Sequence, residues 1–374
     1  MDQFAKMNPN MKTRLNKINK KTNLGKIYLI LLGLSYEECR PGDSLFIQTQ
    51  DSLEVNDSLG ESQMDRTVDS SSESNCFSKC RNIFACKSAT FFADRLHGSK
   101  CLMKDTNRFG VRSRIKRITN GKYFEKTESC SRLSRERRRV IGAVKNAHDC
   151  KDVLKKGWKK DGLYLIQYPG EDIYRPIRCR MSILGGGWTV IQRRVDGTLS
   201  FKGDWKRYKH GFGEVSREFW YGNDNIHNLT KNGDNEVIFE LQADDNKIYH
   251  PYYQQFKVDS EDEKYRLTVG PHEHKYGLVL PPYPTTTVHP TGYDFSDHDQ
   301  KKFTTSDQDN DKASNNCANE YDGSGWWYAS CQRVGINNPL FGGSGKKALK
   351  WTQITNRGDN TKSLKSTEMM IRRK

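Results

Sequence analysis

The sequence at residues 185–194 reads GGGWTVIQRR, and this stretch decides the fold. Its three glycines allow the backbone to approach another segment closely just before a strand begins. The residues from Trp188 to Gln192 then combine aromatic and β-branched side chains, a composition typical of a strand. We therefore predict a sheet-centred domain in which Trp188, like Phe219 and Trp220 farther along the chain, packs in the core rather than against a ligand.

Similar patterns on either side extend this sheet. Strand-like segments lie at 163–166, 237–241 and 265–269, and Asp149 is placed to cap a short helix that ends at Gly157. Farther along the chain the regular patterning fades, because prolines interrupt it and glycine and aspartate dominate. Since loops on a rigid scaffold usually carry binding residues, we expect the functional site in these later loops.

Several sequence blocks occur in a fixed order between residues 150 and 374. They are CKDVL (150–154), GGGWTVIQRR (185–194), DG (196–197), YKHGFG (208–213), EFWYGNDNIH (218–227), GWWY (325–328) and SLKSTEMMIR (363–372). Together they resemble the fibrinogen C-terminal domain of fibrinogen chains, ficolins, tachylectins and angiopoietins. The resemblance implies an α+β fold, in which an antiparallel sheet is followed by a loop-rich, calcium-supported subdomain. It also implies the disulfides Cys150–Cys179 and Cys317–Cys331.

The chain has ten cysteines, and their spacing bears on the cellular compartment. A cytosolic zinc site is the alternative to disulfides. However, the run Cys76-x3-Cys80-x5-Cys86 lacks the Cys-x2-Cys pairs of zinc modules, and no His-x3-His lies nearby. Disulfides formed in an oxidising compartment fit the pattern better, so we expect an extracellular, secreted protein.

The cysteine ladder over residues 36–130 resembles a PAN/apple module, which is a small disulfide-rich α+β domain. Cys76 and Cys80 follow a serine-rich cap and are four apart, which places both on one helix face. The resemblance implies the pairs Cys39–Cys130, Cys76–Cys101 and Cys80–Cys86. Sequence alone leaves the connectivity open, and a secreted disulfide domain of another type is the alternative.

Residues 1–35 are typical of a signal peptide. Basic residues precede the apolar run 27–34, and Gly33 and Ser35 supply the small side chains of a cleavage site after Ser35. This apolar run is too short to cross a bilayer, so we expect no stable membrane span.

Most of the net charge of +16 lies outside the two modules. The leader carries seven Lys or Arg and one acid, and residues 131–149 form a basic linker with six and two. No basic stripe with interleaved aromatic residues is present, so we expect no nucleic-acid partner. The linker sequence Arg135-x-Arg137-Arg138 has the form that furin-like proteases cleave, and a solvated charge run is the alternative.

Asp307, Asp309 and Asp311 alternate along one segment, and alternating carboxylates in a loop are what a hard divalent cation requires. An EF-hand is excluded, because Lys312 stands where that motif needs glycine and Ala318 where it needs glutamate. The resemblance implies a fibrinogen-type calcium site instead, and an acidic solvated loop without a metal is the alternative. The implied ligands are the side chains of Asp309 and Asp311 and the backbone oxygens of Ala313 and Asn315.

In relatives, the loop closed by the second bridge carries a pocket, for acetyl groups in lectin members and for a peptide amine in fibrinogen. The matching positions here are Asp322, Trp326, Tyr328, Ser330, Cys331 and Gln332, with Trp326 and Trp327 bracing the wall. By the same resemblance we expect a cis peptide between Ser330 and Cys331.

Two departures from the family pattern affect this pocket. Gln332 replaces the histidine that often follows the second cysteine, and the stretch from Val279 to Asp299 replaces a glycine-rich approach with four prolines. Acetyl recognition, a pocket for a different ligand and the absence of a pocket therefore all stay open.

These features predict a secreted, calcium-binding recognition protein that binds acetylated glycans in the manner of a lectin, in innate defence or adhesion. The alternative is a protein-binding or assembly ligand of the fibrinogen or angiopoietin kind, without sugar specificity. We expect no enzyme, because the chain has no Gly-x-Ser-x-Gly elbow, no His-Glu-x-x-His and no phosphate loop. Coiled-coil and collagen repeats are also missing, so either the N-terminal module forms a homo-oligomer that supplies avidity or the target is not a simple sugar.

Three smaller motifs complete the sequence. The N-glycosylation sequons at Asn56 and Asn228 fit a secreted glycoprotein. The integrin-type tripeptide Arg357-Gly358-Asp359 is explained more simply by coincidence. His272 and His274 are interpreted as scattered surface residues rather than as a metal or base cluster.

Overall fold

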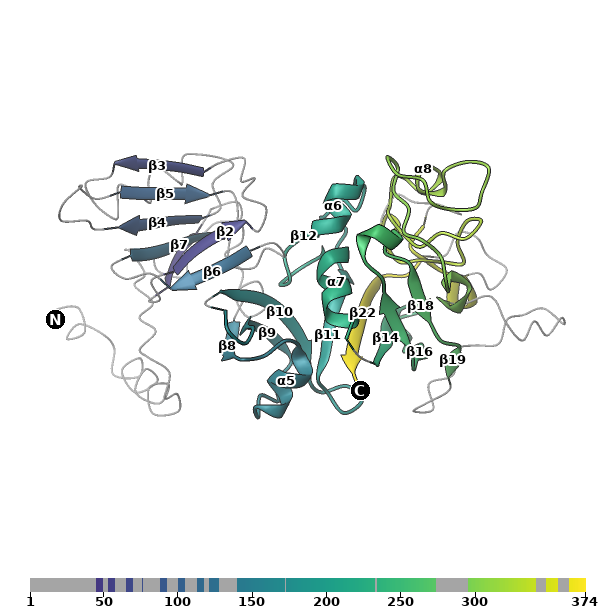
Figure 1. Ribbon diagram of the computed structural model, residues 1–374, viewed down its shortest axis with the longest axis horizontal. Coiled ribbons are helices and arrows are strands. Elements are labelled where there is room, and N and C mark those ends of the chain that lie inside the picture. The colour runs from purple at the N-terminus through teal and green to yellow at the C-terminus, as the bar shows by residue number, and fades with distance from the viewer. Residues whose placement is uncertain are drawn as a thin grey trace. The chain divides into compact units, whose positions relative to one another are not determined.

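The computed structural model describes residues 141–374 except 172, 233, 274–294, 341–347 and 356–362, together with Cys76 and the backbone of Val140 and of the N-terminal strands (Figure 1). The chain divides into two compact units. One comprises residues 1–54, 62–107 and 117–131, and the other comprises residues 55–61, 108–116 and 132–374. The sequence-based module boundaries at residues 35, 130 and 149 stay predictions.

The N-terminal unit is built on an antiparallel sheet of five strands. Their order is β1 (Leu45–Thr49), β7 (Gly121–Thr127), β4 (Ser88–Phe92), β5 (Lys100–Lys104) and β3 (Asp65–Asp69). The same part of the sequence also includes β2 (Leu53–Asp57) and β6 (Ser113–Arg117).

Cys76 is fully buried and disulfide-bonded, as a disulfide-stapled module requires. The predicted pairs Cys39–Cys130, Cys76–Cys101 and Cys80–Cys86 all involve side chains outside the described residues. The connectivity of this module therefore stays a prediction.

The C-terminal unit is organised around a sheet that has the last strand of the sequence near its centre (Figure 1). From β19 (His272–Glu273) the order is β16 (Tyr252–Tyr253), β14 (Asn235–Gln242), β22 (Ser366–Arg373), β11 (Trp188–Arg194) and β10 (Tyr174–Arg180). Beside this path, β9 (Gly162–Gln167) pairs with β10, and β8 (Val140–Lys145) pairs with β9. All neighbouring pairs are antiparallel except β8 and β9, which are parallel. The antiparallel sheet that the sequence predicts is therefore present.

Shorter elements complete this unit. The helices are α5 (Cys150–Lys155), α6 (Trp205–His210), α7 (Asn223–Thr230), α8 (Cys317–Glu320), α9 (Thr352–Thr355) and the 3-10 helices η2 (Glu261–Glu263) and η4 (Phe295–His298). The strands are β12 (Phe212–Gly213), β13 (Phe219–Trp220), β15 (Ile248–Tyr249), β17 (Phe256–Val258), β18 (Leu267–Val269), β20 (Val334–Gly335) and β21 (Lys350–Trp351).

Local expectations hold with shifted boundaries. The helix predicted after Asp149 is α5, and the Asp149 side chain accepts the N–H of Asp152 at 2.9 Å. The strand predicted at 265–269 begins only at Leu267. The reason is that Lys264 and Tyr265 both adopt a left-handed backbone, with φ values of 56° and 49°, which no strand can include.

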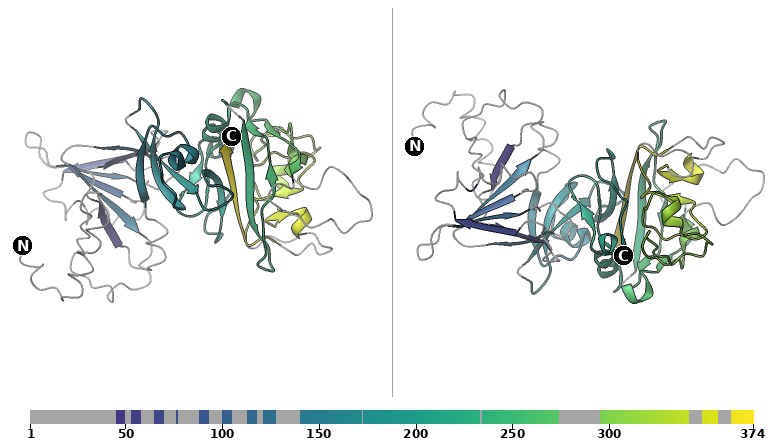
Figure 2. Two further views of the ribbon diagram at one scale, coloured as in Figure 1. Left: turned by 90° about the horizontal axis from the view of Figure 1, so that it is seen from below. Right: turned by 90° about the horizontal axis from the view of Figure 1, so that it is seen from above.

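The loop-built part of the unit lies on one side of the sheet. In both views of Figure 2 the later segments, in green to yellow-green, gather beside β14 and β22, and α5 lies on the opposite side of these strands. Between residues 295 and 355 the described elements are short, at most four residues each. Loops therefore carry the region in which the sequence predicts the site.

A cluster of aromatic rings joins the sheet to these loops. Trp188, Phe219 and Trp220 are fully buried, which confirms the prediction that they are core residues. The ring of Trp220 lies 5.8 Å from that of Trp327, and the ring of Trp327 lies 5.2 Å from that of Trp326. Because indoles bury large areas, this contact fixes the loops against the sheet.

The first predicted disulfide, Cys150–Cys179, belongs to a second and smaller core. Its Cα atoms are 5.5 Å apart, and it joins α5 to β10. Both cysteines are fully buried, together with Val153, Tyr164 and Ile166. The bridge therefore staples α5 to β10, a strand inside the sheet.

Candidate cation and ligand loops

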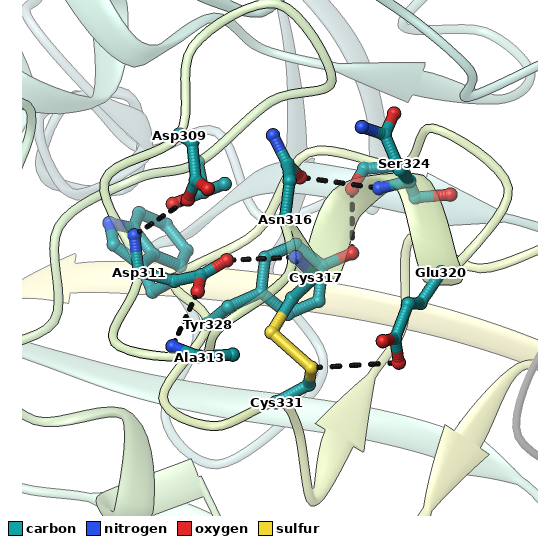
Figure 3. Close-up of a disulfide and its surroundings, with 12 residues drawn as sticks. Asp309, Asp311, Ala313, Asn316, Cys317, Glu320, Ser324, Tyr328 and Cys331 are labelled. Atoms are coloured by element: carbon teal, nitrogen blue, oxygen red, sulfur yellow. Dashed lines mark hydrogen bonds between the residues drawn. A yellow bond between two sulfur atoms is a disulfide. The ribbon is translucent and has the colours of Figure 1, made fainter.

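Two successive loops contain the predicted site residues (Figure 3). We call residues 305–316 the cation loop and residues 317–332 the ligand loop. Thr304 and Trp326 exchange backbone hydrogen bonds of 2.9 and 3.1 Å, which joins the start of one loop to the middle of the other. The predicted Cys317–Cys331 disulfide is present and closes the ligand loop, with Cα atoms 5.5 Å apart.

The cation loop is wound around its own carboxylates. The Asp311 N–H donates to Asp309 Oδ1 at 3.2 Å. The N–H groups of Ala313 and Cys317 donate to the two oxygens of Asp311, at 2.8 and 2.9 Å (Figure 3). The Asp311 carboxylate therefore connects the cation loop directly to the first cysteine of the ligand loop.

These two carboxylates have no counter-ion among the described residues. Neither Asp309 nor Asp311 forms an ion pair there, and within the described residues no group of three or more His, Cys, Asp or Glu side chains is placed to hold a metal ion. Burial raises the pKa of Asp311, and the Asp309 carboxylate adds to this, against the opposing N–H groups of Cys317 and Ala313. Two adjacent carboxylates without a positive partner create a negative potential that a cation would neutralise.

The other two predicted ligands are backbone oxygens. The carbonyl oxygens of Ala313 and Asn315 accept no hydrogen bond from any described residue. Asn315 is exposed and Ala313 is half-buried, so water has access to the same place. A set of two carboxylates, two carbonyls and water is of the hard oxygen type that calcium takes, so these residues fit the ion that the resemblance implies. Calcium binding itself stays a prediction.

Asp307 has a different role from the two carboxylates that follow it. Its Oδ1 atom accepts the N–H of Trp205 at 2.9 Å and the hydroxyl of Thr305 at 2.7 Å. Trp205 is the first residue of α6. Asp307 therefore binds the cation loop to a helix that is distant in sequence, and it lies outside the predicted ligand set.

The predicted pocket residues divide into exposed and buried positions. Asp322 and Ser330 are exposed, whereas Trp326 and Tyr328 are each only 1% exposed. The Tyr328 hydroxyl donates to the Ser324 carbonyl at 2.6 Å, and burial raises the pKa of this phenol well above its usual value. Trp326 and Tyr328 therefore support the loop from beneath, and Asp322 and Ser330 are available at its surface.

Gln332 stands where relatives often have a histidine after the second cysteine, and its surroundings show the local effect of this replacement. The Ser330–Cys331 peptide is cis, as expected, and Cys331 and Gln332 are half-buried. Both the nitrogen and the oxygen of the Gln332 amide are buried without a hydrogen-bond partner among the described residues. The amide packs against Gly335, where an added Cβ would lie 2.4 Å from Gln332 Nε2. The side chain therefore occupies space that only glycine at position 335 leaves free.

Sequence reasoning missed His298, which supports the same loop. This side chain is fully buried, and its Nδ1 lies 2.7 Å from the carbonyl oxygen of Trp327. The N–H of Val334 donates to its Nε2 at 3.3 Å. The two bonds assign the proton to Nδ1, and they connect the segment before Cys331 to the segment after it. Its place in a proline-rich stretch gave no pattern that separates it from a surface histidine.

Several predictions fall elsewhere or outside the described residues. Asn228 is exposed on α7, so the structure leaves room for a glycan there, whereas the side chain of Asn56 is not described. His274 and the tripeptide at 357–359 lie outside the described residues. Within the described part of the sequence, no helix combines the length and the apolar character needed to cross a membrane.

Comparison with protein families gives two matches. Residues 146–374 match the family described as fibrinogen beta and gamma chains, C-terminal globular domain. Residues 52–130 match the PAN domain. The first match contains the region 150–374 of the sequence blocks, and the second lies within the region 36–130 of the cysteine ladder.

Individual relatives agree with the family matches. Fibrinogen-like protein A of Apostichopus parvimensis is 34% identical over 240 residues, which cover 63% of this chain and 78% of that protein. Ryncolin-4 of Cerberus rynchops is 36% identical over 189 residues, which cover 50% of each protein. The chain thus spans between half and about four fifths of these two relatives.

Two solved structures share the fold. The fibrinogen-like globe domain of human ANGPTL6 is 30% identical with a TM-score of 0.52, over 61% of this chain and 95% of that one. The lamprey fibrin D-dimer, complexed with the peptide Gly-His-Arg-Pro-amide, is 28% identical with a TM-score of 0.52, over 66% of this chain and 78% of that one. The protein therefore belongs to the family of the C-terminal globular domain of fibrinogen beta and gamma chains, and a PAN domain precedes that domain.

Proposed function

We propose that this protein is a secreted recognition protein whose ligand loop binds acetylated glycans, with calcium held in the adjacent cation loop. The observation that carries the proposal is the pair of carboxylates that have no counter-ion among the described residues, Asp309 and Asp311, of which Asp311 holds the first cysteine of the ligand loop. Membership of a family whose relatives include a fibrin complexed with a peptide supports a binding role, and in this proposal the protein is not an enzyme.

Each residue has a defined task in this proposal. Asp309, Asp311 and the carbonyl oxygens of Ala313 and Asn315 would hold calcium, which supplies positive charge to a loop of carboxylates. The exposed Asp322 and Ser330 would offer polar contacts to a sugar, above the buried ring of Tyr328. Because one shallow site binds sugar weakly, self-association through the PAN unit would supply avidity.

Secretion and a role in innate defence or adhesion are part of the same proposal. The two described disulfides of the fibrinogen-like unit and the disulfide of Cys76 favour an oxidising compartment. Secretion is tested by expressing the full chain in animal cells and locating it in medium or cell lysate. Retention of all folded protein inside the cell contradicts it.

The calcium site is tested by thermal unfolding of the full chain. Millimolar calcium should raise the Tm, because a ligand at a hundredfold excess over its Kd adds about 2.7 kcal/mol to the unfolding free energy. Asp311→Ala should abolish the rise. Asp262→Ala is the matched control, since it removes an exposed carboxylate from η2 and should leave the rise intact. A wild-type melting curve that calcium does not move contradicts the calcium site.

Ligand class is tested with a glycan array, probed with and without calcium and competed by free N-acetylated sugars. The proposal expects binding that calcium strengthens and that acetylated sugars displace. A second candidate is a peptide or protein ligand, which the peptide complex of lamprey fibrin favours. An array without signal, combined with saturable binding of a defined peptide, would replace the glycan by this second candidate.

A further inference from the structure

We propose that Asp307 is a positioning residue that couples the cation loop to the ligand loop through the segment 201–205. The segment contacts the cation loop at one end and the ligand loop at the other. The identity of the cation as calcium rests on the proposed function. The hydrogen bonds that connect the two loops do not depend on that proposal.

The first half of the coupling is the contact between Asp307 and the start of α6. The Asp307 Oδ1 atom accepts the Trp205 N–H at 2.9 Å, across 102 residues of sequence. The first N–H groups of a helix have no partner within the helix, so this carboxylate satisfies a donor that would otherwise be free. The hydroxyl of the buried Thr305 holds the same oxygen at 2.7 Å, which fixes its direction.

The second half is the contact between the same segment and the ligand loop. The Gly203 N–H donates to the Gly323 carbonyl at 3.1 Å, and Lys202 forms a β-bridge with Ser324. A Cβ on Gly323 would lie 2.8 Å from Lys202 Cγ, so the two segments are in direct contact. Gly323 follows the exposed Asp322, so segment 201–205 positions the backbone beside a predicted ligand contact.

The charges of the cation loop suggest how a bound cation would act on this connection. Asp307, Asp309 and Asp311 place three carboxylates within five residues, and only hydrogen bonds compensate them among the described residues. A cation at Asp309 and Asp311 would relieve their mutual repulsion and favour one arrangement of the loop. Asp307 would transmit that arrangement to Trp205, and segment 201–205 would transmit it to Gly323. By linkage, a ligand at the ligand loop would tighten cation binding by the same factor.

Asp307 can be changed without removing a predicted cation ligand. Asp307→Ala removes the acceptor for Trp205 and Thr305, whereas Asp307→Asn keeps an acceptor oxygen in the same place. Comparing the two variants therefore distinguishes the loss of the hydrogen bonds to Asp307 from a general loss of loop folding. If Asp307→Ala does not fold, Thr305→Val takes its place, because it replaces the hydroxyl that fixes the Asp307 carboxylate with a methyl group of similar size.

The experiment measures amide hydrogen exchange of the full chain with and without calcium chloride, alongside the calcium Kd. In the wild type and in Asp307→Asn, calcium should slow exchange in segment 201–205 and in residues 320–324. In Asp307→Ala, the Kd should stay within about threefold of the wild type, yet calcium should no longer slow exchange in segment 201–205 and in residues 320–324. A purely structural role would change exchange equally with and without calcium, and would not show this split.

Three results overturn the inference, and they differ in meaning. If Asp307→Ala keeps full calcium protection at 201–205 and 320–324, Asp307 does not couple the loops. If Asp307→Ala weakens calcium binding by about tenfold or more, Asp307 acts as a ligand rather than as a positioning residue. If the wild type binds no calcium, the proposed calcium site fails together with the coupling, whereas the first two results leave that site standing.

Discussion

Glu218 and Gln332 are both polar side chains with buried atoms, and they differ in how completely those atoms are paired. The Glu218 carboxylate is 1% exposed and accepts N–H groups from the turn that follows β11, with the Arg194 guanidinium 3.4 Å away. The Gln332 amide finds no partner for either polar atom within the described residues. Since an unpaired buried polar atom costs free energy, Gln332 is a position where stability is lost.

The first prediction concerns this unpaired amide. Gln332→Leu should raise the unfolding free energy by about 1–2 kcal/mol, because it removes two unpaired polar atoms and keeps a side chain of similar size. Urea unfolding of the full chain measures the change. Gln255→Leu is the matched control at an exposed site, where the effect should stay within about 0.5 kcal/mol. A loss of stability in Gln332→Leu contradicts the prediction.

Among the elements, β8 is the exception to an otherwise antiparallel arrangement. It pairs in parallel with β9 and ends at Lys145, just before the family match begins at residue 146. Val144 of this strand is 3% exposed and packs in the second core. Gly142, in the same strand, lies beneath the ring of Trp158, where an added Cβ would be 2.5 Å from a ring carbon. The strand is therefore fitted closely to the rest of its own unit.

The second prediction tests this fit at the level of the element. Gly142→Ala should lower the unfolding free energy by about 1–3 kcal/mol, because the new methyl group forces the Trp158 ring out of its place. Chemical denaturation provides the measurement. In a Trp158→Leu background, the smaller side chain leaves room, and adding Gly142→Ala should then cost much less. Equal costs in the two backgrounds would show that the ring contact does not matter.

Across the whole molecule, the charge of the fibrinogen-like unit is organised in ion pairs on its sheet. Arg180 of β10 lies 2.8 Å from Glu240 of β14 and 2.8 Å from Glu368 of β22. His250 lies 3.4 Å from the same Glu240 carboxylate. Burial would raise the pKa of Glu240, but the contacts with His250 and Arg180 outweigh it, and the pKa of this carboxyl is lowered.

The third prediction is an acid-dependent loss of stability in this unit. Because the folded-state pKa of Glu240 is lowered, its contribution is present above the ordinary pKa of 4.5 and is lost as the pH falls through the folded-state value. The unfolding free energy should therefore decrease with acidification below pH 4.5. Glu240→Gln should reduce this slope, as unfolding in denaturant at several pH values would show. Glu263→Gln, at an exposed carboxylate, is the control and should keep the wild-type slope.

The sequence by itself determined the family, the buried tryptophans, the two bridges of the fibrinogen-like unit and the loops in which the site residues lie. These features depend on local composition and on blocks of fixed order, and both can be recognised without knowledge of spatial partners. The calcium ligands and the pocket residues remain predictions, although the loops that carry them are now described.

Only the tertiary structure decided which distant residues meet. The C-terminal segment enters the centre of the sheet as β22, Asp307 accepts the Trp205 N–H across 102 residues, and His298 connects Trp327 to Val334. The packing of Gln332 against Gly335 is likewise visible only in three dimensions. A sequence pattern indicates which apolar side chains are buried, but the partner of a buried or hydrogen-bonding group is selected by long-range packing. For this reason the family could be predicted from the sequence, whereas the connection between the two loops could not.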